Sequence, residues 1–124
     1  MMRFTRLAVL CLFALVLAAC AGGQPEDPAP VVARYIEAKA ASDRDTIASL
    51  ICAELESQID LEALSFSGVE AQAQDIACTK DANAYTVTCS GAIVAVYAGE
   101  NREFPLSTYR VVQEDGVWKW CGEA

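Results

Sequence analysis

The chain is 124 residues long and carries 17 acidic against 9 basic side chains, which gives a formal net charge of -8. This balance argues against nucleic acid as a partner and against electrostatic attachment to anionic lipids, because both interactions need clustered lysine and arginine. The chain has no histidine, which excludes every catalytic scheme that uses an imidazole, including the common Ser-His-Asp triads.

The first twenty residues have the layout of an export signal. Arg3 and Arg6 precede an apolar run over residues 7–17, and small residues then lead into a cysteine. The run is too short for a transmembrane helix, which needs roughly 20 apolar residues. Its ending, Leu17-Ala18-Ala19-Cys20, resembles a bacterial lipobox.

The lipobox resemblance implies that residues 1–19 are a signal peptide and that Cys20 becomes the diacylated first residue of a lipoprotein. The protein would then face the extracytoplasmic side, held at the membrane by the acyl chains on Cys20. An ordinary secretory signal would instead leave Cys20 as an unpaired thiol. Residues 20–30 contain three prolines and two glycines, which predicts a flexible tether. Residues 31–124 are then expected to form a single domain.

Helices are expected at the start of this domain. Proline is favoured at the first helical position, so the first helix is predicted from Pro30. A second helix is expected from Ser42, and residues 58–64 are predicted to form a short third one. The apolar positions at helical spacing are Val32, Tyr35 and Ile36 in the first helix, and Ile47, Leu50, Ile51 and Leu55 in the second.

After Gly68 the pattern changes to the alternation that is typical of strands. A bend or bulge is expected at Gly91, and the Asp115-Gly116 pair is typical of a hairpin turn. Helices followed by an antiparallel meander indicate an α+β domain, with N-terminal helices packed on a bent sheet of about four strands. The four strands are predicted over residues 69–77, 84–97, 104–113 and 117–121.

This order of elements resembles the nuclear-transport-factor-2-like superfamily, in which a bent sheet wraps a long helix into a cone. The likeness covers about residues 30–122. Within it, three segments resemble small exported lipoproteins: VVARYIEAKAASD at residues 31–43, Leu50-Ile51-Cys52, and GVWKWC at residues 116–121. A cystatin-like domain, also a helix on a sheet, would have a similar pattern.

Four cysteines remain within the predicted domain, and an even number in an exported chain favours disulfides. Their wide spacing and the missing histidine argue against a metal site. If a turn at residues 80–83 joins two strands, Cys78 and Cys89 lie nearly opposite each other, within disulfide range. This arrangement predicts the pairs Cys78–Cys89 and Cys52–Cys121, although four cysteines allow three connectivities.

The last strand presents a conflict for the second pair. In a regular strand Cys121 shares a face with Lys119, while Trp118 and Trp120 share the other. A Cys121 that faces the helices would therefore turn both tryptophans outward. Either the strand bulges near its end, or Cys121 reaches the helix around the edge of the sheet.

Asp75 is the one acid in phase with the alanine face of its strand, formed by Ala71, Ala73 and Ala77. A carboxylate inside an apolar cone could serve as a general base. The alternative is that the strand twists or ends there and that Asp75 is solvated.

Aromatic side chains supply the remaining candidate site residues. Trp118 and Trp120 could form a platform for a sugar or peptide, or they could anchor the core. Strand tyrosines could offer cavity hydroxyls or simply pack; these are Tyr85, Tyr97 and Tyr109.

We expect a lipid-anchored extracytoplasmic domain that binds a protein partner or a small ligand, without catalysis and without a cofactor or metal. One rival is a small cavity enzyme of the isomerase or dehydratase type, with Asp75 as its base. The other rival is a structural envelope protein that acts by self-association, for example as a homodimer through the sheet.

Overall fold

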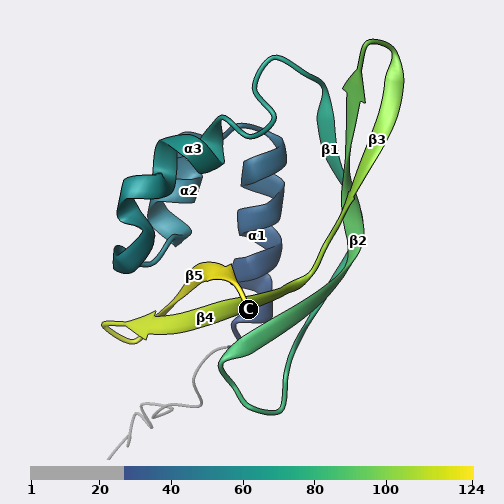
Figure 1. Cartoon of the computed structure of the whole chain (residues 1–124). Helices are drawn as coiled ribbons and strands as arrows, with labels where there is room; N and C mark the ends of the chain where they lie inside the picture. The colour runs from purple at the N-terminus through teal and green to yellow at the C-terminus, as the bar shows by residue number, and fades with distance from the viewer. Residues whose placement is uncertain (1–26) are drawn as a thin grey trace, which may run out of the picture.

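The computed structural model describes residues 27–124. The predicted signal peptide, the lipobox with Cys20 and most of the tether lie outside the described residues. The described chain is an α+β domain with three α-helices, a 3₁₀ helix and an open antiparallel sheet of five strands (Figure 1). None of the helices formed by residues 27–124 has the length and apolarity to cross a membrane.

The helical layer consists of α1 and three shorter helices that follow it. Helix α1 begins one residue before Pro30, and the carboxylate of Asp27 accepts a hydrogen bond from its first backbone N–H at 3.0 Å. Helix α2 begins at Arg44, two residues after the expected Ser42, and is capped by Asp43, whose carboxylate accepts a hydrogen bond from the Thr46 N–H. The helices span Ala29–Ala40 (α1), Arg44–Leu50 (α2), Ala53–Gln58 (the 3₁₀ helix η1) and Ile59–Ala63 (α3).

The expectation that the second helix continues to Leu55 is wrong. Ile51 is extended and forms a parallel bridge with Trp120, and the Cys52 N–H donates to the Trp120 carbonyl at 2.8 Å. The backbone leaves the helix here because the edge of a strand offers it hydrogen-bond partners. Leu55 therefore belongs to η1.

The sheet has the order β1-β2-β4-β5, and β3 pairs with the C-terminal half of β2 (Figure 1). The predicted third strand is thus two strands, β3 and β4, separated at Leu106 and Ser107. Residues 98 and 99 alone form the turn before β3, and both have positive φ angles, as the favoured two-residue hairpin requires. The strands span Ala71–Lys80 (β1), Thr86–Tyr97 (β2), Glu100–Pro105 (β3), Thr108–Glu114 (β4) and Val117–Glu123 (β5).

A β-bulge bends the β1–β2 ladder at Gly91, as the sequence predicted. The register shifts between Gln74 and Ala77, and Gly91 has a φ of +98°. A Cβ at Gly91 would lie 2.5 Å from the carbonyl oxygen of Asp75, so only glycine fits there. The extra residue reverses the alternation of β1. The predicted alanine face therefore ends at Ala73, and Ala77 is exposed.

Both disulfides of the predicted pairing are present. Cys78 and Cys89 are direct partners in the β1–β2 register, with their Cα atoms 4.0 Å apart. Cys52 and Cys121 join the segment before η1 to β5, with a Cα separation of 5.3 Å.

The end of β5 resolves the conflict between Cys121 and the tryptophans. The β4–β5 register shifts between Tyr109 and Val111, which is the irregularity that the first alternative required. As a result the consecutive residues Trp120 and Cys121 are both buried. Cys52 lies directly beside this edge strand, so the disulfide also lies at the sheet edge, as the second alternative required.

Candidate functional site

A hollow of about 610 Å³ opens between α1, the η1–α3 segment and strands β2 to β5. Helix α1 contributes one wall, and α3 faces it across the helical layer. The sheet supplies the other wall, and Figure 1 shows that it bends, so that β4 crosses near the lower end of α1 while β1, β2 and β3 run beside the helix. The hollow thus has helices on one side and a bent sheet on the other.

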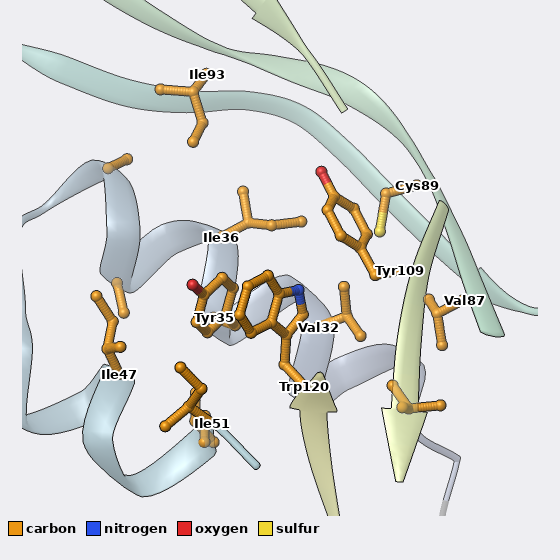
Figure 2. Packing of buried hydrophobic residues seen from close by; sticks show 14 of the residues in the cluster. Val32, Tyr35, Ile36, Ile47, Ile51, Val87, Cys89, Ile93, Tyr109 and Trp120 are labelled. Carbon is orange, nitrogen blue, oxygen red and sulfur yellow. The ribbon is translucent and has the colours of Figure 1, made fainter. Parts of the chain in front are cut away.

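Aromatic and aliphatic side chains form most of the surface of the hollow. Tyr35 and Trp120 stack with ring centroids 3.7 Å apart, and Figure 2 shows this pair beside Ile36 and Tyr109, with Ile93 beyond them on β2. At the α3 side, the rings of Phe66 and Phe104 meet edge to face at 5.2 Å. Apolar walls of this kind favour apolar ligands.

A small polar cluster interrupts the apolar wall. The Tyr35 hydroxyl donates a hydrogen bond to Oε2 of Glu62, and the Lys39 Nζ lies 3.0 Å from the same oxygen. Burial, reinforced by the hydrogen bond to the Glu62 carboxylate, raises the pKa of Tyr35 above its ordinary value. Tyr35 therefore keeps its proton and acts as a donor.

Tyr109 is the one predicted tyrosine that lines the hollow. It is buried, and its hydroxyl oxygen accepts a hydrogen bond from the Ser107 N–H at 3.2 Å. Burial also raises the pKa of Tyr109. Tyr85 is 72% exposed and lies elsewhere. Tyr97 is half-buried, with the Arg102 guanidinium 5.6 Å from the centre of its ring.

Of the two roles considered for the tryptophans, the structure shows core anchoring and not an exposed platform. Trp120 is buried in the core against Tyr35, and Trp118 is half-buried and packs against the same core. Their indole nitrogens are buried, and neither finds a hydrogen-bond partner among residues 27–124. Both tryptophans thus act as core anchors, and only Trp120 reaches the hollow.

Of the two alternatives for Asp75, the structure shows the second, a solvated side chain outside the hollow. Asp75 lies in the β-bulge with a φ of 54°, its side chain is exposed, and it is not part of the wall of the hollow. The extra residue of the bulge is what takes Asp75 out of phase with Ala71 and Ala73. The acid that does line the hollow with little exposure is Glu62, on α3.

Sequence reasoning missed the Lys39–Glu62 pair. Lys39 was recognisable at the edge of the apolar face of α1, but Glu62 lies on a five-residue helix whose placement depends on tertiary packing. The two residues are 23 positions apart, so no local spacing could have linked them.

The sulfurs of Cys52 and Cys121 lie with a carboxylate oxygen of Glu54 in one group of atoms, all within 4.8 Å of one another. The two sulfurs are bonded to each other, so neither is available as a thiolate ligand. This group is a disulfide beside an acid, and it does not have the chemistry of a metal site.

Comparison of the chain with protein-family models found no matching family. Comparisons with curated proteins and with solved structures likewise found no significant match.

Proposed function

We propose that this protein is a lipid-anchored extracytoplasmic binding module that holds a small apolar molecule in the hollow and performs no catalysis. The observation that carries the proposal is the hollow itself. Its volume of about 610 Å³ lies within the range of small-molecule sites, which combine mostly apolar walls with a few fixed polar groups. The surface of the hollow is more apolar than polar, and its fixed polar groups include the Lys39–Glu62 pair.

The location is supported by the disulfides and by the N-terminal segment. Two disulfides indicate an oxidising, extracytoplasmic compartment. The lipobox-like ending at Cys20 supports attachment of the domain to a membrane through acyl chains. The bent sheet beside α1 supports, as part of the same proposal, a nuclear-transport-factor-2-like cone.

Binding without catalysis is favoured by the state of the polar groups. Tyr35 holds its proton, and Oε2 of Glu62 already accepts the Tyr35 hydrogen bond and forms the ion pair with Lys39. Asp75, the base of the rival enzyme, is exposed outside the hollow. Tyr35, Lys39 and Glu62 are thus arranged to bind one another and one polar group of a ligand.

Titration with N-phenyl-1-naphthylamine, an uncharged apolar fluorophore, tests the proposal. The full chain carrying Cys20→Ser avoids the need for detergent, which would compete for the hollow. We expect saturable binding that Leu106→Trp weakens about tenfold or more, because Leu106 lines the hollow and a larger side chain fills it.

Leu64→Trp is the matched control, since Leu64 is exposed and lies outside the hollow. It should bind the fluorophore as the parent chain does. Absence of saturable binding, or equal affinity in both tryptophan variants, would contradict the proposal.

The anchor has a separate test. Mass spectrometry of protein extracted from membranes should find a diacylglyceryl group on Cys20, and Cys20→Ser should release the domain from the membrane fraction. An unmodified Cys20 in membrane-extracted protein would rule out the anchor while leaving the binding proposal intact.

A further inference from the structure

We infer that the hollow selects an uncharged, ring-bearing molecule that carries a hydroxyl group, and that Lys39 and Glu62 together recognise that hydroxyl. This inference rests on the proposed function, because it names the class of ligand that the same hollow takes. It depends on three properties of the hollow: its hydrogen-bonding capacity, its charge and the shape of its walls.

The hydrogen-bonding capacity of the cluster is only partly used. The Tyr35 hydrogen bond and the Lys39 ion pair both involve Oε2 of Glu62, and among residues 27–124 no side chain or backbone group hydrogen-bonds Oε1. The Lys39 ammonium group carries three donor N–H bonds. The pair therefore offers an acceptor oxygen beside ammonium donors. A hydroxyl both donates and accepts, so it can satisfy both at once.

The charges that line the hollow compensate one another. Lys39 is paired with Glu62 at 3.0 Å, and the Arg110 guanidinium lies 3.7 Å from Glu54. Glu123, an exposed side chain, adds a further acid to the wall. At the Lys39–Glu62 pair itself, an anionic ligand would meet Glu62 and a cationic one would meet Lys39, in each case without a free counter-charge at that pair. An uncharged ligand avoids that cost of desolvation.

The shape of the walls favours rings. Phe66 and Phe104 present an edge-to-face pair to the hollow, and Tyr109 lies on the sheet side (Figure 2 for Tyr109). Aromatic side chains pack best against flat rings, in offset or edge-on arrangements. A flat apolar body with one hydroxyl therefore matches the hollow better than an extended or highly polar molecule.

Three probes of nearly equal size separate these properties: 2-naphthol, 2-methylnaphthalene and 2-naphthoate. Each is measured by calorimetry on the full chain carrying Cys20→Ser, at neutral pH. We expect 2-naphthol to bind about tenfold more tightly than 2-methylnaphthalene, with 2-naphthoate the weakest. In Lys39→Met/Glu62→Gln, which removes both charges together, this preference should fall below about threefold while 2-methylnaphthalene binds unchanged.

Lys80→Met/Glu100→Gln makes the same chemical change at exposed positions outside the hollow and should keep the full preference. The single variant Glu62→Gln preserves side-chain shape and replaces the double variant if that one does not fold. Its preference for 2-naphthol should be intermediate. Equal affinities for 2-naphthol and 2-methylnaphthalene, tightest binding of 2-naphthoate, or a full preference in both Glu62 variants would overturn the inference and leave the proposed function standing. If none of the three probes binds, both this inference and the proposed function are contradicted.

Discussion

The two disulfides constrain regions of opposite character. Cys78–Cys89 closes a loop with a sequence separation of 11, between strands that the β1–β2 ladder already pairs. Cys52–Cys121 has a separation of 69 and joins elements that share only a short run of backbone contacts. Chain-entropy reasoning assigns about 3 kcal/mol to the first and about 4 kcal/mol to the second. The local bond reinforces a hairpin, whereas the distant one holds a wall of the hollow.

Removal of the distant disulfide is expected to have the largest effect. Cys52→Ala/Cys121→Ala should lower the free energy of unfolding in urea by about 4 kcal/mol, and Cys78→Ala/Cys89→Ala by about 3 kcal/mol. Only the first variant should also weaken binding of N-phenyl-1-naphthylamine, because Cys121 lines the hollow and its disulfide precedes η1. Equal loss of binding in both variants would show that the two regions do not differ in this way.

The hairpin region has its own weak point at the bulge. Gly91→Ala should destabilise the domain by about 3 kcal/mol, because the new Cβ meets the Asp75 carbonyl and φ is positive. Gly99→Ala is the matched control, since Gly99 also has a positive φ but open space around it, and it should cost about 1 kcal/mol. Urea denaturation of both variants measures the difference. Similar values would mean that the close approach at the bulge is easily relieved.

The smallest expected effect is the contribution of Tyr35, on α1, to the free energy of unfolding at high pH. Folded Tyr35 keeps its proton at a pH where the unfolded chain releases it, because its pKa is raised in the folded state. The stability that this provides is complete below about pH 10 and is lost above it, at up to about 1.4 kcal/mol per pH unit. Tyr35→Phe should cost about 1 kcal/mol at neutral pH through loss of the hydrogen bond to Glu62.

The same substitution should make the alkaline decline in stability shallower, which urea denaturation between neutral pH and pH 11 would reveal. Tyr85→Phe is the comparison, because Tyr85 is 72% exposed, whereas burial raises the pKa of Tyr109 as well. An unchanged decline in Tyr35→Phe would mean that Tyr35 does not titrate differently in the two states.

Local chemistry explains which features were predictable from the sequence. The Asp115-Gly116 turn has positive φ at both residues, as its residue types suggest, and the bulge at Gly91 follows from a glycine within a β-branched run. The cysteine pairing followed from the position of one turn. Each of these depends on neighbours within a few positions along the chain.

The features that were missed depend on contacts between distant segments. The end of α2 at Leu50 is determined by the pairing of Ile51 with Trp120, which no local pattern encodes. The exposure of Asp75 depends on which strand of the ladder receives the extra residue. Glu62 reaches the hollow only because α3 packs near α1, so the candidate site could not be derived from spacing alone.

The extended residues Ile51 and Cys52 have a consequence beyond shaping the hollow. They occupy part of the outer edge of β5, where the Cys52 N–H donates a hydrogen bond to the Trp120 carbonyl. An uncovered strand edge can recruit strands from other molecules and so begin aggregation. The disulfide keeps this cover in place, and a reducing environment would expose the edge to neighbouring copies of the protein.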